Sequence, residues 1–218
     1  MSGIKRLKKP MPLTMPLAVL NSPGISNSLS PLEEVLSPGS YVKPYKLTSR
    51  QSEVVDEILK IRSSYQDKSN YNDANVINGI NLTLTCALHA SFKYNERDDV
   101  SLVSCLPKSQ TEKEKRPNSI YVYSVLDSEN INILRKFDQI AMWIDDQLSE
   151  NKTVVLHCQA GINRSASIAV AYHCLKTGHD IVTAYKYIAD QRSAILSNHK
   201  FIEQLVIWAD GQGLLPPG

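Results

Sequence analysis

The sequence is poor in cysteine, and its few cysteines stand far apart. There are 4 in 218 residues, with no CxxC pair among them, which excludes the usual zinc clusters and disulfide frameworks. We therefore expect reduced thiols in a cytoplasmic or nuclear protein, with neither a metal nor a cofactor. The cysteines are Cys86, Cys105, Cys158 and Cys174.

Long apolar runs and a strong charge bias are also missing. No stretch approaches the ~20 apolar residues that cross a bilayer, so we expect no membrane association. The 24 Lys and Arg residues nearly balance the 22 Asp and Glu residues, for a net charge of +2. This balance argues against nucleic acid as a partner, because such proteins usually carry a basic excess. Any positively charged site must be local.

Composition divides the chain into an arm, a domain and a tail. Residues 1–40 are rich in Pro, Ser and Gly, which predicts a disordered arm. Over 41–212, strand-like and helix-like patterns alternate, predicting one three-layer α/β/α domain with a largely parallel central sheet. Within it we interpret 91–119 as a surface insertion holding a short strand at 100–106, and 213–218 as a tail.

One segment, VVLHCQAGINRS at 154–165, carries most of the chemical information. An apolar run predicts a buried strand before the cysteine, and an Ala-rich run predicts a helix from Arg164 onward. The tight loop between them would turn at Gly161, where no Cβ obstructs it. Because the backbone amides of such a loop converge at a helix N-terminus, the segment predicts a cradle for a tetrahedral anion such as phosphate.

Two side chains of this loop predict chemistry as well as binding. Cys158 would lie at the base of the cradle, where the same field lowers the pKa of a thiol below its free value of ~8.5. Arg164 supplies a planar fork able to hold two phosphate oxygens. A thiolate aimed at bound phosphorus is an activated nucleophile; the alternative is a buried structural cysteine. The predicted phosphate-binding residues are Gln159, Ala160, Gly161, Ile162, Asn163 and Arg164.

The Cys-(x)5-Arg spacing, preceded by His157 and followed by Ser165, resembles the signature loop of protein tyrosine phosphatases. The Arg-Ser-Ala continuation is similar to that of the dual-specificity phosphatases within that superfamily. This resemblance implies hydrolysis of phosphotyrosine and phosphoserine or phosphothreonine in proteins through a phosphocysteine intermediate. It also implies that Ser165 eases the departure of the sulfur and that His157 orients the loop. It spans about 41–210 and is strongest from 119 onward.

The resemblance implies two further functional positions. An alkoxide or phenoxide leaving group needs a general acid, and Asp127 matches the family's aspartate: it follows a strand-like run and stands 31 residues before Cys158. The alternative for Asp127 is an ordinary turn residue. Near the C-terminus, QRSAILSNHKF resembles the family's supporting segment. Asn198 matches that pattern, whereas Ser197 stands where proline is usual.

The sequence is also compatible with functions other than that of a protein phosphatase. An RNA 5′-triphosphatase of the cysteine type also carries Asn before the Arg, as Asn163 does, but Asp127 and the near-neutral charge argue against it. A phosphoprotein-binding pseudophosphatase would typically lack the Cys or the Asp, and both are present. No basic residue occupies the variable loop positions, which argues against inositol phospholipids. With no aromatic motif upstream to deepen the pocket, we expect dual specificity.

A separate hypothesis concerns oxidation. Cys86 ends a strand-like run that would reach the site, so a disulfide between Cys86 and Cys158 would provide redox control. The alternative is that Cys86 is an ordinary small core residue.

Overall fold

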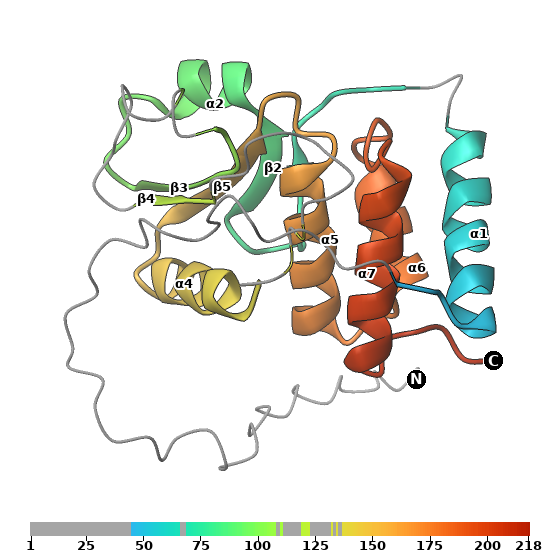
Figure 1. The fold of residues 1–218 in the computed structure, drawn as a ribbon. Helices are drawn as coiled ribbons and strands as arrows, with labels where there is room; N and C mark the ends of the chain where they lie inside the picture. Colours follow the sequence, from blue (N-terminus) through green and yellow to red (C-terminus); the bar gives the residue numbers. More distant parts are fainter. Residues whose placement is uncertain are drawn as a thin grey trace, which may run out of the picture. The chain divides into compact units, whose positions relative to one another are not determined.

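The computed structural model describes residues 45–65, 69–107, 110, 119–122, 132, 134 and 137–218. The predicted arm at 1–40 and the predicted general acid Asp127 lie outside these residues. The described part of the chain contains a five-stranded sheet of order β1-β2-β5-β3-β4 (Figure 1). Its strands are β1 (Ala74–Asn75), β2 (Leu82–Cys86), β3 (Val100–Ser104), β4 (Ser119–Tyr121) and β5 (Thr153–Cys158).

The sheet is largely parallel, as the alternation of patterns predicts. Strand β5 pairs in parallel with β2 on one side and with β3 on the other, and β3 pairs in parallel with β4. Only the short β1, among the described strands, runs antiparallel to its neighbour β2. Carboxyl ends of parallel strands meet at one edge of a sheet, so Cys158 at the end of β5 lies between the ends of β2 and β3.

Helices cover both faces of the sheet, which confirms the predicted α/β/α layers, but they do so unequally (Figure 1). On one face, Val155 of β5 packs with Ala90 and Tyr94 of α2. On the other face, Val154 and Leu156 belong to the large core that includes α4 and α5. The described helices are α1 (Ser49–Ser64), α2 (Ala87–Tyr94), α4 (Phe137–Ser149), α5 (Arg164–Thr177), α6 (Ile181–Ala189) and α7 (His199–Gly211).

Helix α5, which follows the loop after Cys158, is the most enclosed of the described helices. Every residue from Arg164 to Cys174 is buried, because α5 packs on β5 and is covered by α6 and α7. The outermost helix of this layer is α1, which contacts α6 and α7. None of the described helices is long and apolar enough to cross a membrane. The loop is therefore fixed between a central strand and a central helix.

Within the predicted insertion at 91–119, the predicted short strand at 100–106 is present as β3, but this strand does not lie at the surface. Strand β3 lies between β5 and β4, and all five of its residues are buried. Its residues include the polar Ser101 and Ser104, which are both buried. Inside the protein, the Ser101 hydroxyl donates a 2.7 Å hydrogen bond to Gln147 Oε1 of α4. A bonded hydroxyl can be buried at little cost, so a serine in a strand does not indicate exposure.

The predicted tail at 213–218 is likewise held against the domain. The N–H of Ile181, at the start of α6, donates to the carbonyl of Leu214 over 2.9 Å. Arg50 on α1 donates to the carbonyls of Pro216 and Pro217 at 2.7 and 3.0 Å. These backbone contacts make the last residues part of the helical layer, which a reading of composition alone does not reveal.

Candidate active site

Cys158 is the last residue of β5 and is only 2% exposed. The loop that follows it returns at once to Arg164, the first residue of α5. This return brings the Ser165 hydroxyl within 3.2 Å of the Cys158 sulfur, to which it donates a hydrogen bond. The strand–loop–helix predicted from the sequence therefore exists, and it brings Cys158, Arg164 and Ser165 together around one sulfur.

The surroundings of the sulfur favour its thiolate form. Burial raises the pKa of the Cys158 thiol, but this effect is outweighed by groups that lower it. They are the Ser165 hydroxyl and backbone N–H, the positive charge of Arg164 and the backbone N–H of Ile162. The net result is a pKa below the ordinary value of a thiol, as expected where amides of a helix N-terminus converge on sulfur.

Arg164 is fixed from the neighbouring strand. Its side chain is buried, and Nη1 donates a 2.9 Å hydrogen bond to the carbonyl oxygen of Cys105, directly after β3. The Cys105 N–H in turn donates to the His157 carbonyl at 2.8 Å, so the end of β3 carries the guanidinium beside the loop. Burial and the nearby Cys158 raise the pKa of the Cys105 thiol despite the charge of Arg164. Of these two adjacent thiols, only Cys158 is acidified.

Gly161 is required by close packing as well as by the turn. Its φ is +66°, and a Cβ at this position would lie 2.3 Å from the carbonyl oxygen of Thr85 and 2.7 Å from Nη2 of Arg192. Real Cβ atoms do not approach other atoms so closely, and L side chains rarely adopt such a φ. The loop can therefore form here only without a side chain.

Arg192 holds the outer side of the loop, a role that the sequence did not reveal. This residue is fully buried. Its Nε donates to the Gly161 carbonyl at 3.0 Å and its Nη2 to the Ala160 carbonyl at 2.8 Å. Its Nη1 donates to the carbonyls of Tyr71 and Asn72, which precede β1. One guanidinium thus joins the loop to a segment far away in the sequence.

The Arg192 contacts also explain how the loop amides face the sulfur. In a trans peptide the C=O and the following N–H point in opposite directions. The Gly161 carbonyl points to Arg192, so the N–H of Ile162 points away from it. That N–H is one of the groups that lower the pKa of Cys158. Arg192 is therefore a positioning residue for the anion cradle.

The other side of the loop is held by the segment before α7. The side-chain Nδ2 of Asn163 donates to Ser197 Oγ at 3.1 Å, and the side-chain Oδ1 of Asn163 accepts a hydrogen bond from the Asn198 N–H at 3.0 Å. The Leu196 N–H donates to the Ile162 carbonyl at 2.8 Å. The Asn198 side chain caps α7. These contacts place Asn198 where a supporting residue is expected, and Ser197 contributes a hydroxyl bond that proline could not make.

The remaining predicted site residues differ in where they lie. His157 is buried directly before Cys158, paired with Thr85 of β2 and Ser104 of β3. Gln159 and Ala160 are exposed at the outer part of the loop. Asp127 lies outside the described residues, so its predicted role as general acid stays a prediction.

A thiol of lowered pKa lies beneath a loop of amides and beside a buried arginine, at the carboxyl edge of a parallel sheet. This is the arrangement that the sequence predicts for a cysteine-based phosphate site. Comparison with known families agrees. The model of the dual specificity phosphatase catalytic domain matches residues 65–210, which is more than half of the chain. The protein belongs to the dual specificity phosphatase family.

Individual relatives show the same likeness. The chain is 35% identical over 82 residues to tyrosine-protein phosphatase yvh1 of Schizosaccharomyces pombe, covering 38% of this chain and 25% of that protein. It is 26% identical over 155 residues to dual specificity protein phosphatase Mpk3 of Drosophila melanogaster, covering 68% of this chain and 37% of that protein. The chain spans about half or less of the length of the curated relatives it matches, so the likeness concerns the phosphatase domain.

Solved structures share the fold at low sequence identity. The human tyrosine phosphatase-like serine/threonine/tyrosine-interacting protein aligns with a TM-score of 0.55 at 22% identity, covering 66% of this chain and 99% of that one. The tyrosine phosphatase OH1 from the Orf virus aligns with a TM-score of 0.57 at 17% identity, covering 72% of this chain and 96% of that one. The single-domain architecture is thus that of the tyrosine phosphatases.

Proposed function

We propose that this protein is a protein phosphatase that hydrolyses phosphotyrosine and phosphoserine or phosphothreonine through a phosphocysteine intermediate. The observation that carries the proposal is the acidified Cys158 sulfur, which receives hydrogen bonds from Ser165 and a backbone N–H of the loop and feels the charge of Arg164. Family membership supports the same activity. A phosphoprotein is the corresponding partner.

In the first step, a substrate phosphate occupies the cradle and the Cys158 thiolate attacks phosphorus. The S–P bond forms as the P–O bond to the substrate breaks, and Asp127 protonates the leaving oxygen. Negative charge on the phosphoryl oxygens is stabilised by the loop amides and Arg164, which are fixed before the reaction begins. The contacts of Arg192 and of the Cys105 carbonyl supply this preorganisation.

In the second step, water hydrolyses the phosphocysteine. Asp127, now ionised, accepts a proton from the water as its oxygen attacks phosphorus, and the S–P bond breaks. The electron pair of that bond returns to sulfur. Ser165 Oγ, already 3.2 Å from the sulfur, stabilises the departing thiolate by hydrogen bonding. The same hydroxyl therefore assists the sulfur both as nucleophile and as leaving group.

The test uses the three strand-end cysteines of the site as a matched set. The purified 218-residue chain is assayed on phosphotyrosine and phosphothreonine peptides and on RNA bearing a 5′-triphosphate. We expect Cys158→Ser to abolish hydrolysis while peptide binding persists, because the loop survives. Cys86→Ser and Cys105→Ser should remain active, since it is the sulfur of Cys158 to which the Ser165 hydroxyl bonds. Rapid quenching of the wild-type reaction should trap phosphate on Cys158.

Three outcomes would overturn the proposal. Turnover by Cys158→Ser would remove this residue as the nucleophile. Hydrolysis of the RNA triphosphate with no activity on either peptide would instead support the RNA 5′-triphosphatase. Peptide binding by the wild type without any turnover would support a phosphoprotein-binding protein.

A further inference from the structure

One acidic residue, Asp73, lies where three elements meet beside the catalytic loop. It directly precedes β1, and its side chain is 17% exposed. Its Oδ1 accepts hydrogen bonds from the Thr85 hydroxyl and from Nδ1 of His89, the latter at 3.0 Å. Its Oδ2 accepts from Nζ of Lys93 at 3.0 Å. Asp73 therefore joins the segment before β1 to the end of β2 and to α2.

Two of these elements border the first half of the loop. The carbonyl oxygen of Thr85 in β2 is so close to Gly161 that a Cβ there would lie 2.3 Å from it. The N–H of Ala87, the first residue of α2, donates to the Gln159 carbonyl at 3.3 Å. The three donors to Asp73 all come from β2 and α2. The carboxylate thus holds both elements where they meet the loop.

The third element connects Asp73 with Arg192. The two residues directly before Asp73 are Tyr71 and Asn72, whose carbonyls accept from Nη1 of Arg192. The other nitrogens of this guanidinium bond to loop carbonyls. Carbonyl oxygens carry only partial charges, so they satisfy the donors of a buried cation without neutralising it. A fully buried guanidinium is therefore stabilised further by a negative charge nearby.

Asp73 provides such a charge. Burial lowers the pKa of the Arg192 guanidinium, and the groups that oppose this lowering are Cys86, Asp73, Cys158 and Tyr71. Asp73 is the carboxylate among these four. Burial raises the pKa of the Asp73 carboxyl itself, but its three hydrogen-bond donors outweigh that effect and hold the pKa below its ordinary value. Asp73 is therefore an anion at neutral pH.

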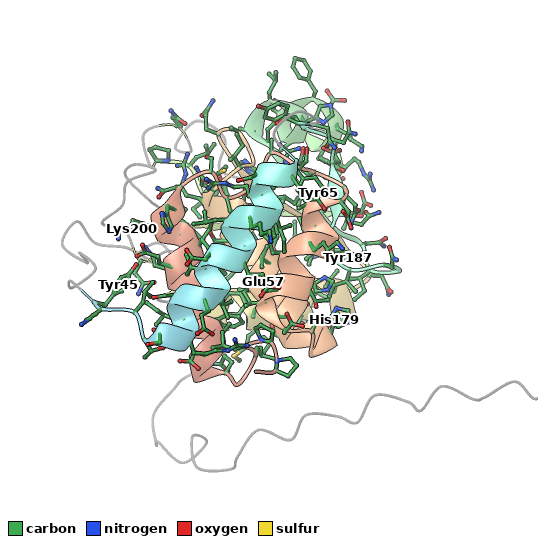
Figure 2. All side chains as sticks on the ribbon, turned by 90° about the vertical axis from the view of Figure 1, so that its right-hand side faces the viewer. Tyr45, Glu57, Tyr65, His179, Tyr187 and Lys200 are labelled. Carbon is green, nitrogen blue, oxygen red and sulfur yellow. The ribbon has the colours of Figure 1, made fainter. Side chains whose placement is uncertain are left out.

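Asp190 is nearer to Arg192 in the sequence, but its carboxylate has another partner. It accepts a hydrogen bond from the hydroxyl of Tyr65, which follows the outer helix α1 (Figure 2). Asp190 is also exposed, and water and salt screen the charge of an exposed carboxylate. The less exposed Asp73 is thus the better source of negative charge for Arg192.

We infer that Asp73 is a positioning residue for the phosphatase reaction, which keeps Arg192 and the ends of β2 and α2 in the arrangement that directs the loop amides to the Cys158 sulfur. The inference rests on the proposed function, since it takes the loop to hold the substrate phosphate. Without the charge of Asp73, Arg192 is less stable in its buried place. The Gly161 carbonyl and the N–H of Ile162 are then held less firmly, and the Cys158 thiol becomes less acidic.

The first test is the pH dependence of Cys158 alkylation by iodoacetamide, followed by mass spectrometry, in the wild type and in Asp73→Asn. The amide keeps the shape of the carboxylate and removes its charge. We expect the half-maximal rate at a higher pH in the variant. On a phosphotyrosine peptide, kcat/KM should fall about tenfold, the size of one charge-assisted hydrogen bond. A loss of overall stability alone would lower the unfolding temperature without moving the alkylation profile of the folded protein.

Asp99→Asn provides the matched control. Asp99 also pairs with a basic side chain, that of Arg97, but it directly precedes β3 and so lies at the edge of the sheet opposite to Cys158. We expect this variant to keep the wild-type alkylation profile and kinetics. An unshifted profile in folded Asp73→Asn protein, or an equal shift in Asp99→Asn, would overturn the inference.

A double variant tests whether Asp73 acts through Arg192. If it does, the two losses do not multiply, because the second substitution weakens an arrangement that the first has already disturbed. Adding Asp73→Asn to Arg192→Lys should therefore lower kcat/KM by less than about threefold further. A further loss as large as that of Asp73→Asn alone would show that Asp73 acts independently of Arg192, against the inference.

Thr85→Val covers the case in which Asp73→Asn does not fold. Valine resembles threonine in shape but lacks the hydroxyl, so Asp73 loses one of its three donors. We expect a smaller shift of the alkylation profile in the same direction, and no shift would overturn the inference.

Alkylation requires no turnover, which separates this inference from the proposed function. If the wild type hydrolyses no phosphopeptide but the profile shifts in Asp73→Asn, the proposed function fails and the positioning of the loop by Asp73 stands. Hydrolysis by the wild type together with an unshifted profile would overturn the inference alone.

Discussion

The Nε of Arg192 and the carbonyl oxygen of Gly161 are joined by a 3.0 Å hydrogen bond between residues 31 positions apart. Arg192 is fully buried, and burial lowers the pKa of its guanidinium, although nearby groups such as Cys86, Asp73 and Cys158 oppose this effect. A buried cation that bonds to several carbonyls couples the loop geometry to distant backbone. The shape of the anion cradle is therefore a property of the whole fold.

Replacing Arg192 with Lys should impair catalysis while keeping a positive charge. An ammonium has three donors on one nitrogen, so it cannot replace all the bonds that three guanidinium nitrogens make to four carbonyls, and the loop loses support. Hydrogen bonds to charged groups are worth about 1.5–3 kcal/mol, and we expect kcat/KM to fall by about 10–100-fold. Arg50→Lys is the control. Wild-type kinetics in a folded Arg192→Lys protein would contradict the positioning role.

Removing the Ser165 hydroxyl should make the Cys158 thiol less acidic, because that hydroxyl is the foremost group lowering its pKa. Alkylation of Ser165→Ala by iodoacetamide should then reach its half-maximal rate at a higher pH than in the wild type. Hydrolysis of phosphocysteine should also slow, so the intermediate accumulates. Ser167→Ala is the control, because its hydroxyl bonds to the Asn163 carbonyl. Identical pH profiles for all three proteins would remove Ser165 from the mechanism.

Asp127→Asn tests the predicted general acid. An amide cannot protonate the leaving oxygen, so turnover of phosphopeptides should fall by roughly 10²–10⁴. A substrate with an activated leaving group, such as nitrophenyl phosphate, should be less affected because its oxygen needs less protonation. Asp138→Asn, which alters an exposed residue of α4, serves as control. An unchanged rate on phosphopeptides would eliminate Asp127.

Mild peroxide should join Cys158 to Cys86. Their Cα atoms are direct partners across the parallel strands β5 and β2, a spacing of about 4.8 Å that a disulfide can bridge. Peroxide would oxidise the Cys158 thiolate to a sulfenic acid. The Cys86 sulfur would then attack the Cys158 sulfur, forming the disulfide and releasing water. Cys86 is half-exposed, whereas Cys105 is fully buried with a raised pKa. Mass spectrometry without a linked 86–158 peptide pair would end this hypothesis.

The fold should lose stability in mild acid through His173. Burial, followed by the neighbouring His179, lowers the pKa of His173 despite the Val76 carbonyl, to which its Nδ1 bonds at 2.6 Å. The unfolded state then binds a proton at a higher pH than the folded state. Stability is retained above the unfolded pKa of ~6.5 and declines as pH falls below it. Urea unfolding between pH 7 and 5 should show a flatter decline for His173→Gln than for the wild type, and equal declines would contradict this role of His173.

The sequence was informative where structure is local. The loop from Cys158 to Arg164 could be predicted because a buried strand, a glycine turn and a helix start follow one another in a short segment. The strand β3 was predicted but its buried, central place was not, because Ser101 has its hydrogen-bond partner on α4, 46 residues away. Likewise, no local pattern shows that Arg192 bonds to Asn72, 120 residues earlier. Contacts of this kind depend on the completed fold.

The end of α1 illustrates the same limit. No local pattern shows that Arg62 donates to the carbonyls of Leu196 and Ser197, more than 130 residues later. The strand, turn and helix start around Cys158 are thus encoded in a few adjacent residues, whereas the contacts that support the loop come from distant ones.

Because Arg192 bonds to the carbonyls of Tyr71 and Asn72, the signature motif alone is not a working site. A fragment starting at β2 would retain every residue from Cys158 to Ser165, yet it would leave a buried cation with only its two loop acceptors. Proteolytic cleavage just before β1 should therefore abolish phosphatase activity, although the cut lies more than eighty residues upstream of Cys158.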